Sequence, residues 1–126
     1  MRVKRILIID DEEDIREVAQ IALEVVGGWE VLTASSGSEG IAIAKVQQPD
    51  AILLDVMMPE MDGIATFQNL QTNPATDKIP VIFLTAKVQS ADQRRFATLG
   101  VTATIAKPFK TMTLAEQVAE FLGWNG

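Results

Sequence analysis

The sequence predicts an α/β fold in which five parallel β-strands alternate with five helices in a three-layer sandwich. Short apolar runs rich in β-branched residues alternate with segments whose apolar residues recur at helical spacing. Strands that alternate with helices are parallel, and right-handed crossovers place the helices on both faces of the sheet. In addition, polar side chains stand at the ends of four of the apolar runs. These observations predict a polar site at one edge of the sheet.

Five apolar runs are predicted to be strands. Their length suits buried strands rather than helices, and the fifth is the least apolar of them. In chain order the predicted strands are Arg5–Asp10, Trp29–Ala34, Ala51–Asp55, Val81–Thr85 and Val101–Ala106.

The first two helices have recognisable boundaries. The first is predicted to begin at Glu13 and to end at Gly27, because glycine is common at helix C-termini. Ser36 and Glu39 form a capping box that begins the second helix, and Pro49 ends it. The predicted apolar face of the first helix consists of Ile15, Val18, Ala19, Ala22, Val25 and Val26.

The remaining three helices follow the third, fourth and fifth runs. Phe67 and Leu70 lie at helical spacing in the third helix, and Gly100 ends the fourth. Thr113 and Glu116 match a capping box, so the fifth helix is predicted to begin at Thr113.

Composition limits the possible functions. The chain has 126 residues, of which 48% are hydrophobic, so we expect one domain spanning residues 1–126 without an output domain. The net charge of -6 disfavours direct nucleic-acid binding. No apolar run approaches the ~20 residues of a membrane span, and the first residues do not resemble a signal peptide. We therefore expect a cytoplasmic protein without membrane insertion.

Three reactive residue types are missing. Cysteine, histidine and tyrosine are absent, which excludes disulfides, thiol catalysis and histidine ligands. Any phosphoryl group transferred to this protein must therefore be received by a carboxylate.

The polar residues at the strand ends come from four distant segments. Asp10 ends the first predicted strand and Asp11 follows it, Asp55 and Thr85 end the third and fourth, and Lys107 follows the fifth. The carboxyl ends of parallel strands meet at one edge of the sheet, so these side chains are expected to share one pocket. Three carboxylates, a hydroxyl and an ammonium suit a divalent cation and a phosphoryl group.

Each of these residues also has an ordinary interpretation. Acids at a helix N-terminus cap it and favour its dipole by ~0.3–1 kcal/mol each. Asp55 and Thr85 are common residue types at strand ends and turns, and Lys107 is of a type usually exposed to solvent. Three adjacent carboxylates, however, raise one another's pKa unless a cation neutralises them, and an open site with oxygen ligands favours Mg²⁺.

The motifs taken together resemble the receiver domain of two-component response regulators. The resemblance covers essentially the whole chain, in register with all five predicted strands. It implies a flavodoxin-like sheet with strand order 2-1-3-4-5. The residues that carry it are Asp10-Asp11, Asp55, Met58-Pro59, Gly63, Thr85-Ala86 and Lys107-Pro108-Phe109.

The resemblance implies a role for each site residue. Asp55 is expected to be the phosphoacceptor. The expected ligands of Mg²⁺ or Mn²⁺ are Asp10, Asp11, Asp55 and the backbone carbonyl of Met57. The residues expected to contact the phosphoryl group are Thr85, Ala86 and Lys107. The residues expected to shape the loops are Pro59, Gly63 and Pro108, and a cis Lys107–Pro108 bond would direct the lysine inward.

The resemblance also implies partners. The phosphoryl donor is expected to be a phosphohistidine of a sensor histidine kinase or of a histidine phosphotransfer protein. The domain is not expected to be an enzyme beyond catalysing its own phosphorylation and dephosphorylation. A downstream protein is expected to bind the face from about Gln89 to Leu122.

One position departs from the family pattern. Many receivers carry Tyr or Phe two residues before the lysine, whereas this chain has Ile105. A β-branched aliphatic side chain is stiff at χ1 and has no ring to rotate. We therefore expect the usual aromatic coupling to be weakened or replaced by a backbone shift of the loop after Thr85.

Three other functions are less consistent with the sequence. A haloacid-dehalogenase-like phosphatase needs a second Asp two residues after its nucleophile, where this chain has Met57, and a substrate-binding cap. A flavin-binding domain needs a glycine- and hydroxyl-rich first loop, and here that loop is acidic. A degenerate receiver that only binds partners is disfavoured by the intact acidic, threonine and lysine positions.

Overall fold

The computed structural model describes residues 3–58, 61–86 and 90–124. Pro59 and Gln89, which the sequence analysis singled out, lie outside these ranges. None of the described helices is both long and apolar enough to cross a membrane.

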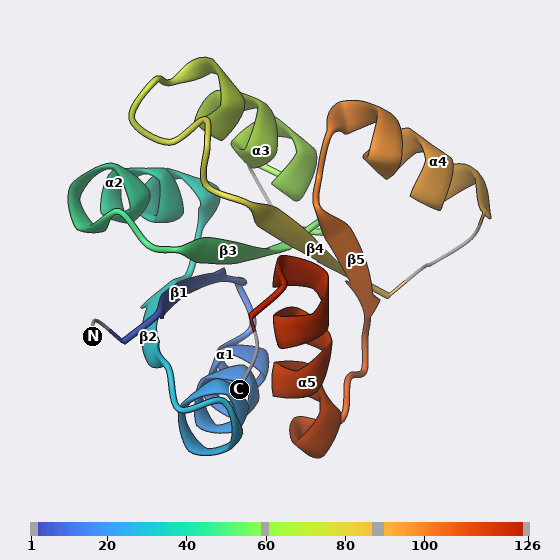
Figure 1. Ribbon diagram of the computed structural model, residues 1–126. Coiled ribbons are helices and arrows are strands. Elements are labelled where there is room, and N and C mark those ends of the chain that lie inside the picture. Colours follow the sequence, from blue (N-terminus) through green and yellow to red (C-terminus); the bar gives the residue numbers. More distant parts are fainter. Residues whose placement is uncertain (1–2, 59–60, 87–89, 125–126) are drawn as a thin grey trace.

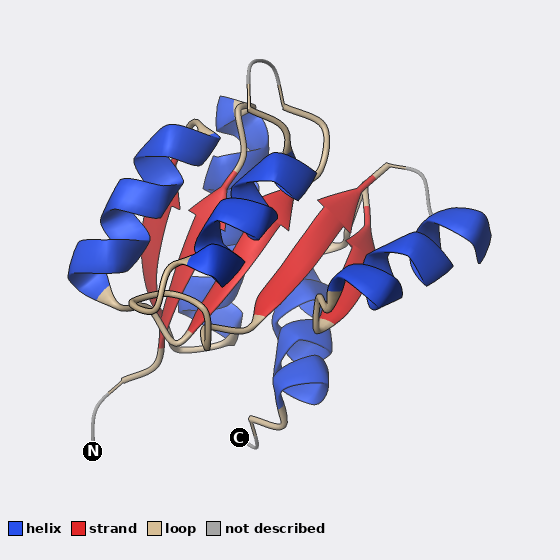
Figure 2. Ribbon diagram, turned by 90° about the horizontal axis from the view of Figure 1, so that it is seen from above, coloured by secondary structure: helices blue, strands red, loops and turns tan. Residues whose placement is uncertain are grey.

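The sheet has the predicted order and direction. Five strands pair in parallel in the order β2-β1-β3-β4-β5, and their arrowheads point the same way in Figure 2. Helices cover both faces, with α2, α3 and α4 on one face and α1 and α5 on the other (Figure 1). The strands are β1 (Arg5–Ile9), β2 (Glu30–Ala34), β3 (Ala51–Asp55), β4 (Val81–Thr85) and β5 (Ala103–Ala106). The helices are α1 (Glu13–Ile21), η1 (Ala22–Val26), α2 (Gly37–Gln47), α3 (Gly63–Thr72), α4 (Ser90–Leu99) and α5 (Thr111–Leu122).

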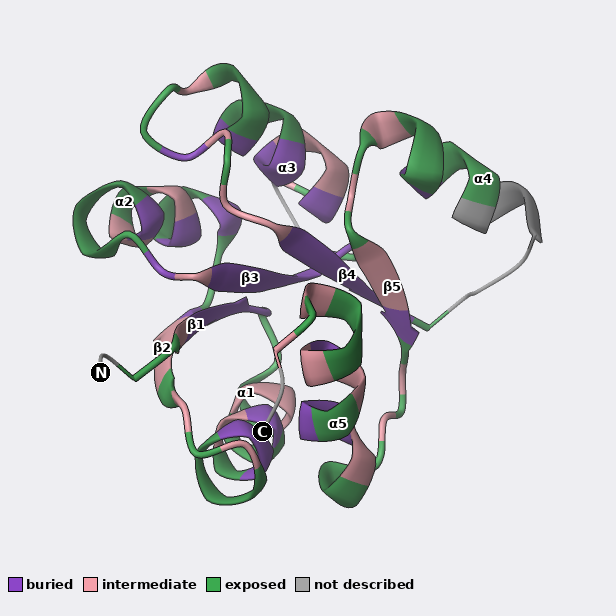
Figure 3. Cartoon of the chain, viewed as in Figure 1, coloured by how far each residue is buried: buried purple, intermediate pink, exposed green. Residues whose placement is uncertain are grey.

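Two hydrophobic cores lie on opposite faces of the sheet. Alternate residues of the central strands point to opposite faces, so that Leu7 and Ile9 of β1 join one core while Ile6 and Ile8 join the other. The central strands are therefore buried on both sides (Figure 3), which explains why their sequences are continuously apolar. Burying each large apolar side chain contributes about 1.5–3 kcal/mol.

The beginning of α2 confirms the predicted capping box. The N–H of Glu39 donates to the Ser36 hydroxyl oxygen at 3.2 Å, and the Glu39 carboxylate accepts from the N–H of Ser35 at 3.0 Å. The predicted capping box of α5 is wrong. Helical hydrogen bonding already begins at the carbonyl of Lys110, which accepts from the N–H groups of Thr113 and Leu114, so Thr113 lies inside the helix.

The predicted apolar face of the first helix is also partly wrong. The helix ends before Gly27 as predicted, but its last turn, η1, is a π-helix in which the N–H of Gly27 donates to the carbonyl of Ala22. This wider turn changes which side chains face the sheet: Leu23 is buried, whereas Val25 and Val26 are exposed. Val18 is 40% exposed, and Ala19 is the buried residue of α1.

Gly63 lies where α3 begins and touches the end of β3. A Cβ atom at this position would collide with the carbonyl oxygen of Asp55 and would lie 2.6 Å from the Cα of Val56. The N–H of Gly63 also donates to the carbonyl of Val56 at 2.9 Å. Only glycine allows this close approach of the two backbones.

We expect Gly63→Ala to lower the free energy of unfolding by roughly 1–3 kcal/mol, because the added methyl group overpacks a rigid backbone contact. Urea denaturation followed by circular dichroism measures the change. Gly123→Ala is the control, since its Cβ meets no atom within 4 Å and only its positive φ is strained. Equal stability of Gly63→Ala and the parent protein would contradict the expectation.

Candidate functional site

The structure brings the predicted polar residues together at the carboxyl edge of the sheet. Asp10 follows β1, Asp55 and Thr85 are the last residues of β3 and β4, and Lys107 follows β5. Asp10, Asp55 and Thr85 are buried, with exposed fractions of 0%, 2% and 4%. Four segments that are distant in the sequence therefore form one site.

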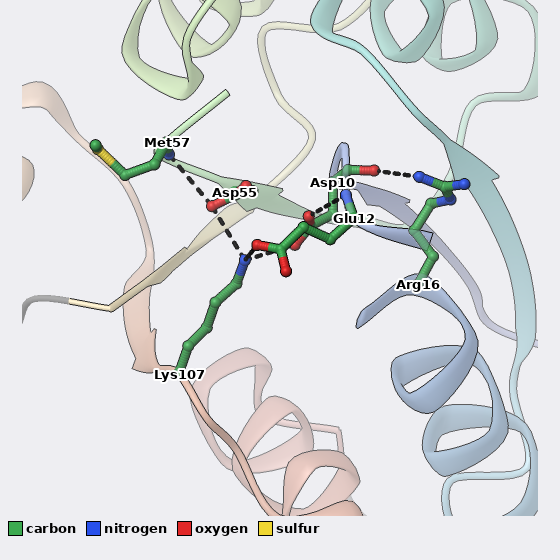
Figure 4. Close-up of polar contacts among 6 residues, drawn as sticks. All are labelled: Asp10, Glu12, Arg16, Asp55, Met57 and Lys107. Carbon is green, nitrogen blue, oxygen red and sulfur yellow. Dashed lines mark hydrogen bonds and ion pairs between the residues drawn. The ribbon is translucent and has the colours of Figure 1, made fainter. Parts of the chain in front are cut away.

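The ammonium of Lys107 lies at the centre of the site (Figure 4). Its Nζ is 2.7 Å from Oδ2 of Asp10 and 3.2 Å from Oδ1 of Asp55. The Lys107–Pro108 peptide bond is cis. Because the lysine side chain is only 11% exposed, water screens these pairs weakly. Lys107 is therefore not the solvated lysine of the ordinary interpretation.

Three carboxylates form a candidate cation site beside the lysine. One oxygen from each of Asp10, Asp11 and Asp55 lies within 4.8 Å of the other two, and Asp11 is exposed. Both oxygens of Asp10 accept hydrogen bonds, Oδ1 from the N–H of Glu12 at 2.9 Å and Oδ2 from Lys107.

One carboxylate oxygen of Asp55 accepts no hydrogen bond from the described residues. Its Oδ1 accepts from Lys107 and from the N–H of Met57 at 3.2 Å. Its Oδ2 is buried and has no hydrogen-bond partner among the described residues. A buried carboxylate oxygen without a partner is costly, so a cation or a phosphoryl group at this position fits the site. The oxygen-only set of side chains fits Mg²⁺ or Mn²⁺.

The surroundings of Asp55 favour its neutral form. Burial and the charge of Asp10 raise the pKa of Asp55 from 3.8 to about 6, although Lys107 and the N–H of Met57 oppose this change. Burial alone would lower the pKa of Lys107, but the hydrogen bonds and negative charges of Asp10 and Asp55 raise it above 10.5. The lysine therefore remains charged, while Asp55 holds its negative charge at a cost.

The remaining predicted residues surround this cluster. Thr85 pairs with Ala106 across the β4–β5 ladder, and Ala86 is exposed immediately after it. Ile105 is 2% exposed and packs in the core beneath α5. The side chain of Met57 is 74% exposed at the mouth of the site.

Sequence reasoning missed two residues of the site. The carboxylate of Glu12 lies 4.0 Å from the Nζ of Lys107. The guanidinium of Arg16 donates from Nη1 to the backbone carbonyl of Asp10 at 2.7 Å. The available signal was an arginine two residues after the end of an unbroken acidic run and four residues after Glu12.

Comparison with known proteins agrees with this geometry. Residues 6–119 match the family model of the response regulator receiver domain. The alkaline phosphatase synthesis transcriptional regulatory protein PhoP of Bacillus subtilis is 37% identical over 119 residues, which are 94% of this chain and 48% of PhoP. The DNA-binding dual master transcriptional regulator RpaA of Synechocystis is 38% identical over 118 residues, again 94% of this chain and 48% of the relative. The chain thus spans about half the length of these relatives.

Solved structures show the same fold. Chemotaxis response regulator CheY4 of Vibrio cholerae superposes with a TM-score of 0.88 at 28% identity, covering 95% of this chain and 99% of CheY4. The signal receiver domain of a histidine kinase from Syntrophus aciditrophicus gives a TM-score of 0.82 at 34% identity, covering 95% of this chain and 90% of that one. With the strand order, the strand-edge carboxylates and the family match in agreement, the chain belongs to the response regulator receiver domain family of two-component signalling.

Proposed function

We propose that this domain accepts a phosphoryl group on Asp55 from a phosphohistidine of a sensor histidine kinase or histidine phosphotransfer protein. The observation that carries the proposal is the buried Oδ2 of Asp55, which has no partner among the described residues, while Oδ1 of the same carboxylate pairs with the ammonium of Lys107. Asp55 can therefore act as a nucleophile toward phosphorus through Oδ2, while Oδ1 stays paired with Lys107. We also propose that the domain meets this donor in the cytoplasm.

The three adjacent carboxylates support the proposed metal ligands. Asp10, Asp11, Asp55 and the backbone carbonyl of Met57 would hold Mg²⁺ or Mn²⁺. Asp11 would bind more directly than Asp10, whose two oxygens already accept hydrogen bonds from the N–H of Glu12 and from Lys107. When bound, the ion supplies positive charge that offsets the carboxylates and the phosphoryl oxygens.

The transfer reaction needs little from the protein beyond position and charge. An oxygen of Asp55 forms the new bond to phosphorus as the phosphorus–nitrogen bond of the donor breaks, and the imidazole retains the electron pair. Lys107, already within 3.2 Å of Asp55, then pairs with the phosphoryl oxygens. The hydroxyl of Thr85 and the N–H of Ala86 provide further contacts at the neighbouring strand end. Water later hydrolyses the acyl phosphate, so the domain catalyses only its own modification.

The signal would leave the site through the face formed by α4, β5 and α5, from about Gln89 to Leu122. Thr85 ends β4 and Lys107 follows β5, and these are the two strands nearest this face. A movement of either residue toward the phosphoryl group would therefore alter the edge of the face. We propose that residues 1–126 act as one receiver domain that reports its state through protein contacts.

We expect a small acyl-phosphate donor with Mg²⁺ to add a phosphoryl group to this protein, visible by intact-protein mass spectrometry. The adduct should be absent from Asp55→Asn, because an amide is a poor nucleophile. Asp14→Asn, which changes an exposed acid in the first turn of α1, is the control and should be modified normally. Turnover of the donor without an adduct would instead indicate a phosphatase, and no reaction would indicate a binding module.

We expect the stability of the metal-free protein to depend on the ionisation of Asp55. The pKa of Asp55 is about 6 in the folded state and 3.8 ordinarily, so the folded state binds more protons between these values. Its contribution to the free energy of unfolding therefore falls as the pH rises from about 4 to about 6. At 1.36 kcal/mol per pKa unit, this loss is roughly 1–3 kcal/mol.

Asp55→Asn isolates this contribution because its amide does not titrate. Compared with the parent protein in EDTA, the variant should gain relative stability between pH 4 and pH 7 in urea denaturation. A stability difference that does not change with pH would contradict the shifted pKa.

We expect Ile105 to keep its rotamer when the domain is activated, because the side chain is β-branched and packed in the core. Structures of the free protein and of its complex with a phosphate-mimicking beryllium fluoride should differ at the backbone after Thr85 instead. A large rotamer change at Ile105 with an unmoved loop would refute this expectation.

A further inference from the structure

Arg16 of α1 contacts the backbone of the site, not its carboxylates. Its Nη1 donates to the carbonyl oxygen of Asp10 at 2.7 Å, and its side chain is half-buried (Figure 4). The N–H of Asp10 is bound on its other side to the carbonyl of Ala34 at 3.1 Å. Asp10 is therefore fixed by the neighbouring strand on one side and by α1 on the other.

The contacted carbonyl belongs to the peptide unit between Asp10 and Asp11. A peptide unit is planar, so holding its oxygen fixes the orientation of the whole plane. That plane sets the ψ angle of Asp10 and the φ angle of Asp11, and thereby the direction in which the Asp11 side chain leaves the chain. Asp11 is exposed, so few surrounding side chains restrain it. The hydrogen bond from Arg16 thus restrains the backbone at Asp11, whose exposed side chain is not held by packing.

The charge of Arg16 would have the opposite effect on a bound cation. A guanidinium near three carboxylates reduces their negative potential, which weakens the attraction for Mg²⁺. A positioning contact strengthens that attraction by keeping the carboxylate of Asp11 close to those of Asp10 and Asp55. The two roles therefore predict changes of opposite sign when the side chain is replaced.

We infer that Arg16 is a positioning residue for the metal site: it holds the Asp10–Asp11 peptide plane so that the Asp11 carboxylate faces Asp55. The inference rests on the proposed function, in which these carboxylates bind a divalent cation. Arg16 touches neither the cation nor the phosphoryl group in this account. Its effect passes through the orientation of the turn between β1 and α1.

The test is isothermal titration of the purified chain with Mg²⁺. Arg16→Met keeps the apolar stem but removes the donor and the charge, and it should weaken Mg²⁺ binding on the order of 10-fold, as loss of a contact that orients a ligand does. Arg16→Lys retains one donor and should restore part of the affinity. Unchanged or tighter binding by Arg16→Met would overturn the inference, because a charge role or a purely structural role gives that result.

Lys45→Met is the matched control, since it removes a cation from the last turn of α2, outside the site. Circular dichroism and urea denaturation establish whether the variants are folded. If Arg16→Met is not folded, the Mg²⁺ affinity of Arg16→Lys alone tests the positioning role. Weaker Mg²⁺ binding by Arg16→Lys than by the parent would then support the inference, and an equal affinity would overturn it.

The titration also separates this inference from the proposed function. Failure of the parent protein to bind Mg²⁺ would refute the metal site and with it the role of Arg16. Binding that is lost in Asp11→Asn but unchanged in Arg16→Met would leave the proposed function intact and refute the inference alone.

Discussion

The site depends on one buried ammonium. Lys107 reaches the carboxyl edge of the sheet from β5 and pairs with Asp10 and Asp55, which follow or end two other strands. Without the lysine, two adjacent carboxylates that are almost fully buried would face each other in a poorly solvated pocket. The lysine offsets this repulsion only in part, since the pKa of Asp55 is still raised to about 6. The remaining imbalance of negative charge is what suits the site to a cation.

The same arrangement bears on what the proposed phosphorylation of Asp55 would do to the site. The resting ammonium is shared between two carboxylates, and a phosphoryl group on Asp55 would compete for it with additional negative charge. Any such competition pulls on the segment after β5, which leads into α5. In this chain Ile105 packs tightly in the core beneath that helix. We therefore expect the proposed signal to pass through the backbone of packed strands, because no aromatic ring stands at position 105 to rotate.

The loops that hold the carboxylates are fixed by backbone contacts. Gly63 lets α3 begin against the end of β3, directly behind Asp55. Arg16 binds the carbonyl of Asp10 from the first helix. Both contacts involve main-chain atoms: that of Gly63 lies beside Asp55, and that of Arg16 lies at Asp10. Rigid strands thus supply the positions of the acids, and in the proposed role of Arg16 a backbone contact supplies the orientation of Asp11.

The sequence alone determined the strands, their parallel arrangement and the residues that meet at one edge. This was possible because strands buried on both faces must be continuously apolar, and because local signals such as the Ser36–Glu39 capping box act within one turn. The tertiary structure alone decided the π-helical turn that exposes Val25 and the start of α5 before Thr113. It also decided the contacts of Glu12, Arg16 and Lys107. The pairing of Lys107 with Asp10 joins residues separated by 97 positions, so no local pattern specifies it; it exists because folding brings the ends of β1, β3 and β5 to the same edge.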